Sequence, residues 1–184
     1  QLRERSDILE TICDQPEAAL ADVSRAIDIA PEWADVYSDR AFTNARLGRL
    51  DASLVDLDRA VELAPAWGWM PLNRGWVLFL LDRYEDAVEN YSRAIELLPG
   101  ESYAYLSRGE ALLVLGRQDQ ALSDLDRAVS LNPDNRYVRA RAYLALGRID
   151  VMPMERNVAC DLIRRNLTEP EASRLTAHPR LLTD

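Results

Sequence analysis

Four prolines recur along the chain at an interval of 34 residues, at Pro31, Pro65, Pro99 and Pro133. Each proline ends a stretch of the same kind, from "AALADVSRAIDIAP" to "QALSDLDRAVSLNP". Aligning the stretches gives two columns of small side chains and one of arginine. The columns are Ala19, Ser53, Ala87 and Ala121, then Ala26, Ala60, Ala94 and Ala128, and finally Arg25, Arg59, Arg93 and Arg127. A fixed period of this length indicates helix–turn–helix units that stack on one another.

Each period divides into two predicted helices. The first helices are expected over 2–13, 34–47, 69–81 and 102–115, and the second helices carry apolar residues at helical spacing, such as Leu54, Leu57 and Val61. A proline closes each period because it cannot continue a helix. We also expect each first helix to end at a glycine or aspartate, which can form the required turn. These residues are Asp14, Gly48, Asp82 and Gly116.

The pattern closely resembles the tetratricopeptide repeat family, over roughly residues 1–148. The resemblance implies an all-α fold, a right-handed α-solenoid of stacked antiparallel helix pairs with about four units and a C-terminal capping helix. The repeat array is expected over residues 1–150. Its units are about 1–33, 34–67, 68–101 and 102–135, with a partial unit at 136–150. Residues 151–184 are expected to form the capping helix and tail, because a solenoid must cover its last apolar face.

A recurring charged pair is also visible in the repeats. Arg40, Arg74 and Arg108 share one column of the first helix, beside a small residue that should pack closely. We therefore predict that these arginines hydrogen-bond inside the solenoid to one column of the second helix. That column is Asp22, Asp56, Asn90 and Asp124. The alternative is a row of ligand-binding arginines.

Charge and composition argue against several functions. The net charge of −9 disfavours binding to nucleic acid and to anionic membrane surfaces. The sequence contains no run of about 18 apolar residues, so we expect no transmembrane helix. The single histidine, His178, cannot build a catalytic set, Cys13 and Cys160 are too far apart to suggest a metal site, and no Gly-rich phosphate loop is present. We expect no enzyme activity, no cofactor and no metal.

The predicted helix over 69–81 carries two apolar stripes. One stripe occupies columns that are apolar or small in the neighbouring units too, which is typical of a core. It contains Met70, Gly75, Val77, Leu78 and Leu81. The other stripe varies between polar and apolar from unit to unit, as expected of a surface that is free to specialise. It contains Trp69, Leu72, Trp76, Phe79 and Leu80.

In the family that the chain resembles, the first helices line a concave groove, which usually holds a peptide or protein segment. The candidate partner-binding residues are therefore Asp39, Phe42 and Arg46, then Trp69, Leu72, Asn73, Trp76 and Phe79, and finally Tyr103, Leu106 and Glu110. The family's chaperone-tail clamp uses Lys and Asn to hold a terminal carboxylate, and this chain has no Lys. An apolar peptide or amphipathic helix therefore fits better than a heat-shock chaperone tail.

These observations predict a non-enzymatic protein–protein interaction scaffold that binds an apolar or amphipathic segment in its groove. One alternative is a regulatory or sensor domain of a larger multidomain enzyme or signalling ATPase, and another is an export or assembly chaperone. Trp69 and Trp76 could instead be covered by the neighbouring unit, by the chain's own tail, or by a second copy in a homo-oligomer. Trp33 and Trp67 are expected to pack between repeats.

We expect a bacterial protein located in the cytoplasm. A periplasmic or secreted location stays open, because the native N-terminus is not visible.

Overall fold

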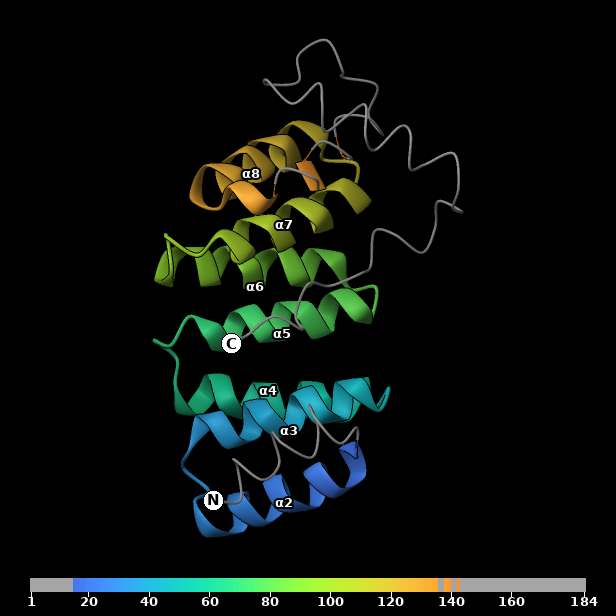
Figure 1. Cartoon of the computed structure of the whole chain (residues 1–184), viewed down its shortest axis with the longest axis vertical. Helices are drawn as coiled ribbons and strands as arrows, with labels where there is room; N and C mark the ends of the chain where they lie inside the picture. The colour runs from blue at the N-terminus through green and yellow to red at the C-terminus, as the bar shows by residue number, and fades with distance from the viewer. Residues whose placement is uncertain (1–14, 136–137, 140–141, 143–184) are drawn as a thin grey trace.

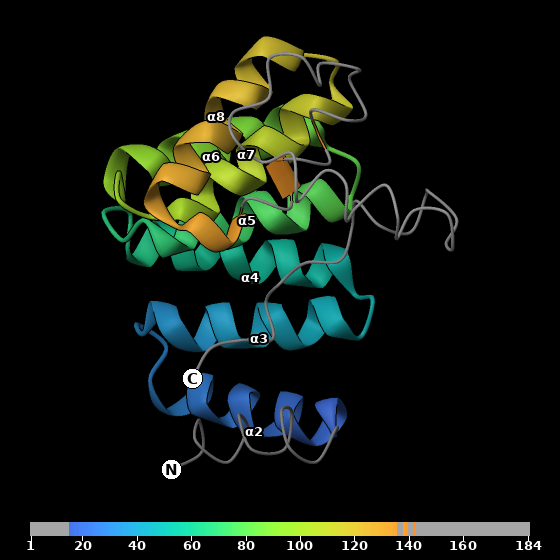
Figure 2. The same ribbon diagram turned by 45° about the horizontal axis from the view of Figure 1, so that its top comes forward.

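The computed structural model describes residues 15–135, 138, 139 and 142, and this part of the chain is a stack of helices without strands (Figure 1). The helices are α2 (Pro16–Ile29), α3 (Ala34–Arg46), α4 (Leu50–Leu63), α5 (Trp69–Leu80), α6 (Tyr84–Leu97), α7 (Ser102–Val114), α8 (Gln118–Leu131) and the short 3₁₀ helix η1 (Pro133–Asn135). Each helix contacts the next along the chain, so the repeats build one elongated array (Figure 2). The all-α repeat solenoid predicted from the period is confirmed. The helix expected over 2–13, the partial unit at 136–150 and the capping helix fall wholly or mostly outside the described residues.

The described first helices end in a left-handed turn, as the sequence predicts. Gly48 and Gly116 both have φ of +72°, and Asp82 has φ of +58°. In each turn, an amide two residues beyond the helix cap bonds a carbonyl of the last helical turn. One example is Arg83 N to Leu78 O, at 2.9 Å. Aspartate is a rarer choice than glycine at such a φ, and here the Tyr84 hydroxyl donates a hydrogen bond to its carboxylate.

Small residues let the helices of one unit approach closely. Ala19, Ser53, Ala87 and Ala121 are fully buried. Gly75 lies against the ring of Tyr91, such that a Cβ atom at position 75 would sit 2.7 Å from Tyr91 Cε1. Tyr91 itself has no exposed surface, and its burial raises the pKa of its hydroxyl well above the ordinary value. The α5–α6 interface therefore has no room for a larger residue at position 75.

Replacement of Gly75 by alanine should destabilise the protein. The new methyl group meets a buried ring, and overpacking of this kind costs about 1–3 kcal/mol, against about 1 kcal/mol gained in helix propensity. Gly100→Ala is the matched control, because a Cβ there meets nothing within 4 Å. Urea unfolding should show a lower midpoint for Gly75→Ala and little change for Gly100→Ala. An unchanged midpoint for Gly75→Ala would show that the interface is loosely packed.

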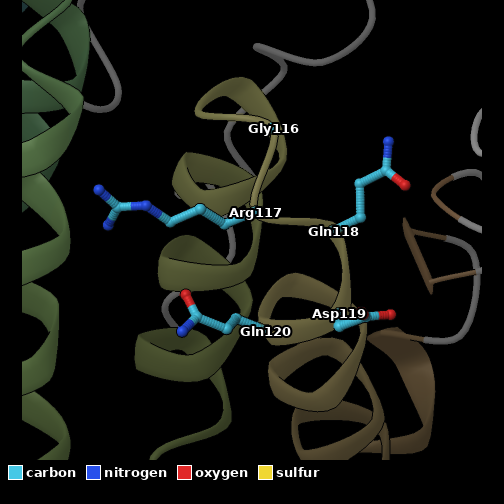
Figure 3. A pocket seen from close by; sticks show the side chains of 5 residues that line it. All are labelled: Gly116, Arg117, Gln118, Asp119 and Gln120. Atoms are coloured by element: carbon cyan, nitrogen blue, oxygen red, sulfur yellow. The ribbon is translucent and has the colours of Figure 1, made fainter.

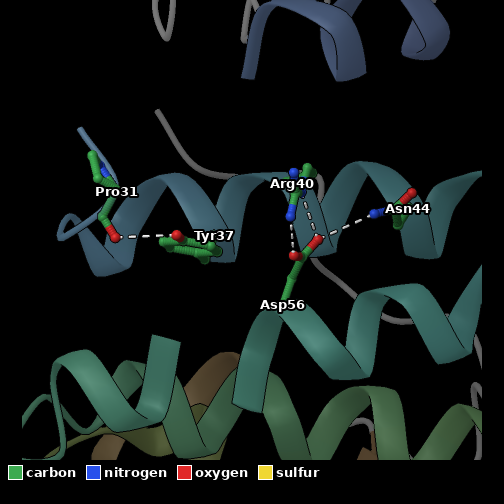
Figure 4. Close-up of polar contacts among 5 residues, drawn as sticks. All are labelled: Pro31, Tyr37, Arg40, Asn44 and Asp56. Carbon is green, nitrogen blue, oxygen red and sulfur yellow. Dashed lines mark hydrogen bonds and ion pairs between the residues drawn. The ribbon is translucent and has the colours of Figure 1, made fainter. Parts of the chain in front are cut away.

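Two of the three column arginines tie the helices of one unit together, as predicted. Arg40 donates two hydrogen bonds to Asp56, from Nε to Oδ2 at 2.9 Å and from Nη2 to Oδ1 at 2.6 Å (Figure 4). Asn44 donates to the same carboxylate at 3.2 Å. Arg108 grips Asp124 in the same way, at 2.7 and 2.8 Å. These hydrogen bonds raise the pKa of both guanidinium groups, although burial opposes the shift. Both arginines therefore stay charged inside the array.

The third arginine departs from the prediction. Arg74 does not bond Asn90, whose side chain donates instead to the carbonyl of Asp86 at 2.9 Å. Arg74 Nε donates to Asp58 Oδ1 of the preceding unit at 2.7 Å. A neutral amide is a weaker partner than a carboxylate for a guanidinium, which favours the pair with Asp58. Arg108 shows the same backward reach, to the Ser92 hydroxyl at 3.0 Å.

Loss of the arginine at position 40 should destabilise the array far more than loss at position 74. Arg40→Ala removes both arginine hydrogen bonds to the Asp56 carboxylate, whose side chain is only 5% exposed, and leaves the one from Asn44. Breaking a buried pair costs about 3–5 kcal/mol, and we expect about 2–4 because Arg40 is partly solvated. Arg74→Ala removes a pair with a half-exposed Asp58, worth about 1 kcal/mol or less. Denaturant unfolding of both variants checks this, and equal losses would contradict it.

Candidate protein-interaction site

The first helices of successive units meet and form one continuous face. α3 contacts α5, and α5 contacts α7. The rings of Phe42 and Trp76 lie 5.8 Å apart between centroids, tilted by 35°, and Asn73 Nδ2 donates to Ser38 Oγ at 3.0 Å. We call this surface the first-helix face. It comprises Asp39, Phe42, Arg46, Trp69, Asn73, Trp76, Tyr103 and Glu110, which share equivalent columns of the repeat.

The members of this face differ in exposure. Trp69 is 39% exposed, which is a large apolar area for a soluble surface, and Arg46 is also exposed. The other six members are half-buried. Half-buried rings beside an exposed indole give a broad apolar surface with polar groups among them. Such a surface suits the apolar side chains of another polypeptide.

Three of the predicted site residues belong to the core instead. Leu72 is 1% exposed, Phe79 8% and Leu106 2%, so none of them can present a surface to a partner. Neighbouring helices cover all three side chains. Leu72 and Phe79 share a cluster with buried residues of α6 and α7, including Tyr91 and Ala104.

Phe79 and Leu106 also contact aromatic or aliphatic side chains of the helix that follows their own. The Phe79 ring meets Tyr84 edge-on, with 5.2 Å between the centroids. Leu106 packs with Leu122 and Leu125 of α8. The apolar stripe on the first helices is therefore narrower than the sequence predicts, because part of it fills the junctions between helices.

The tryptophans between the units are more exposed than predicted. Trp33 is 64% exposed and Trp67 is 40% exposed, so the expectation that both pack between repeats is wrong for Trp33 and only partly met by Trp67. Trp33 is the N-cap residue of α3 and has an extended backbone. Its ring therefore lies at the end of a helix and not between two helices. Ile29 and Val55 are exposed as well, and no sequence signal pointed to them.

The hollows on the described surface do not resemble ligand pockets. The first, of about 590 Å³, is lined by Gly116, Arg117, Gln118, Asp119 and Gln120 at the start of α8. Figure 3 shows that the side chains of Arg117 and Gln118 point away from each other, so the lining does not converge on a single point. A second hollow, of about 640 Å³, includes Arg108, which is already bonded to Asp124 and Ser92.

The described part of the chain offers neither a metal site nor a membrane span. Within these residues, no three His, Cys, Asp or Glu side chains are grouped so that they could hold a metal ion. None of the helices described above is both long and apolar enough to cross a bilayer.

Two segments of the chain match models of the tetratricopeptide repeat, residues 72–100 and residues 102–135. Among curated proteins, no sequence relative was found. Many solved structures share the fold. MamA 41-end from Desulfovibrio magneticus RS-1 aligns with a TM-score of 0.72 at 16% identity, covering 92% of this chain and 96% of that chain. TTC0263, a thermophilic TPR protein in Thermus thermophilus, aligns with a TM-score of 0.72 at 21% identity, covering 90% and 97%.

A shorter match is a structure that contains a peptide. The first TPR of Spaghetti (RPAP3), bound to the HSP90 peptide SRMEEVD, aligns with a TM-score of 0.59 at 22% identity and covers 62% of this chain and 93% of that chain. At these identities the structural matches show the shared fold. Together with the repeat matches, they show that the chain belongs to the tetratricopeptide repeat family. Membership of this family supports a role in protein interaction.

The boundary between core and surface on α5 can be tested by truncating side chains. Leu72→Ala should cost about 2–5 kcal/mol, since it empties a buried site, whereas Trp69→Ala should cost less than about 1 kcal/mol at an exposed site. Thermal and urea unfolding of the two variants give the comparison. A Trp69→Ala variant as unstable as Leu72→Ala would show that the indole is structural and not available to a partner.

Proposed function

We propose that the chain is a non-enzymatic interaction scaffold whose first-helix face lines a concave groove and binds an apolar or amphipathic segment of another protein. The observation that carries the proposal is the exposed indole of Trp69 on the helix that also presents Trp76, which is paired with Phe42. Burying Trp69 against a partner removes apolar area from water, which is the main favourable term in most protein association. Tryptophan is also enriched among the residues that dominate binding energy.

The polar members of the face support a choice of ligand chemistry. Asp39 and Glu110 bring negative charge to two first helices, and Arg46 is the one cation among the defined members. The Spaghetti repeat is bound to a peptide with the acidic end SRMEEVD. This chain has no Lys with which to copy a lysine-based clamp for such an end. We therefore propose a ligand that is apolar with basic or neutral flanks.

A peptide library panned against the full chain tests this function. Bound peptides should be rich in Leu, Ile, Phe or Met and poor in acidic residues. Trp69→Ala should weaken their binding about 30-fold, because a buried Trp anchor contributes about 2 kcal/mol or more. Isothermal calorimetry or intrinsic fluorescence gives the dissociation constants.

Val55→Ser is the matched control, since Val55 is an exposed apolar side chain on α4 and lies outside the first-helix face. It should leave binding within twofold of the wild type. Equal loss in both variants, or peptides indifferent to Trp69, would show that the first-helix face is not the binding surface.

A further inference from the structure

We propose that the first-helix face also binds a segment of its own chain, residues 172–183, which competes with an external partner for the same surface. This inference rests on the proposed function, because it names a second ligand for the same site. The segment reads "ASRLTAHPRLLT". The segment lies outside the described residues.

The chemistry of the segment complements the face. It carries two arginines and no acidic residue, although the whole chain has a net charge of −9. Its leucines supply apolar groups for the rings of Trp69 and Trp76. Its two guanidinium groups carry charge of the opposite sign to Asp39 and Glu110, and a guanidinium can stack on an indole in a favourable cation–π contact. An acidic segment would instead meet like charge at Asp39 and Glu110.

The tether is long enough for the segment to reach the face. Ala142 packs in the same cluster as Leu106 and Leu122, so the described chain ends beside α7 and α8. Residues 143–171 separate Ala142 from the segment, and a stretch of this length can span at most about 100 Å. Packed helices lie about 8–10 Å apart, so the first helices α5 and α7 are both within this span.

Tethering makes even weak binding sufficient. A tether long enough to join the two sites gives an effective concentration on the order of 1 mM. A segment with an intrinsic dissociation constant of about 100 µM would therefore be bound in about ten molecules for every one in which it is unbound. An external partner would have to compete with it, so its apparent affinity would be about tenfold lower than its intrinsic affinity.

Substitutions in the full chain test the competition without removing any part of the protein. In the variant Arg180→Glu/Leu181→Asp, the segment loses a cation and an apolar group. The probe is a synthetic peptide with the sequence of residues 172–183, measured by the fluorescence of the chain's tryptophans, because the peptide has none. This variant should bind the peptide about tenfold more tightly than the wild type. Ser173→Ala is the matched control within the same segment and should leave the affinity unchanged.

A second measurement ties the effect to the face. Adding Trp69→Ala to the double variant should abolish the gain, and a scrambled peptide should bind neither protein. Equal affinity of the peptide for wild type and double variant, or no binding to either, overturns self-binding. Self-binding is also overturned if the wild-type fluorescence per molecule changes with protein concentration, because the segment would then bind a second copy.

The two proposals fail in distinguishable ways. Panned peptides that depend on Trp69 and bind the wild type and the double variant equally would leave the proposed function standing while self-binding falls. Panned peptides that ignore Trp69 would remove the proposed function itself, and self-binding at this face would fall with it.

Discussion

Close approach of the two helices in each unit is the constraint on which the rest of the structure depends. It requires a small residue in fixed columns, and the period of 34 residues places that residue at the same height in every unit. Gly75 against Tyr91 is an example in the α5–α6 pair. Glycine in the first helix makes room for a large side chain of the second, as Gly75 does for Tyr91 and Gly109 does for Leu125. The first helices of successive units also contact one another, and together they form the first-helix face.

Much of this architecture could be predicted from the sequence, because the repeat supplies several independent readings of the same position. The helix ends at Gly48, Asp82 and Gly116 and the pairs Arg40–Asp56 and Arg108–Asp124 follow directly from aligned columns. Where one unit departs from the others, the columns no longer suffice. Arg74 faces an uncharged Asn90 and takes a partner 16 residues earlier, which the forward spacing of the other pairs does not reveal. The backward contact of Arg108 with Ser92 has the same spacing.

The candidate site was harder to predict, since variation between units does not separate exposed positions from positions buried at a junction. The column of Leu72 and Leu106 holds Ser38 in the preceding unit, and the column of Phe79 holds Ala45 and Leu113. Leu72, Phe79 and Leu106 are nevertheless all buried. The column of Trp69, which holds Asp35 and Tyr103 in the neighbouring units, also varies, but the side chain of Trp69 reaches the surface. The helical period gives the direction in which a side chain leaves its own helix. Only the neighbouring helices decide whether that side chain is buried.

The backward contacts of Arg74 and Arg108 also affect how the array comes apart. In a linear array, stability is the sum of what each unit contributes alone and what each boundary adds. The pairs Arg74–Asp58 and Arg108–Ser92 each cross a boundary between adjacent units, whereas Arg40–Asp56 stays within one unit. Under a pulling force applied at the ends, cross-boundary contacts of this kind couple the rupture of adjacent units. The segment from α4 to α8 should therefore yield in fewer, larger steps than a string of mechanically independent hairpins would.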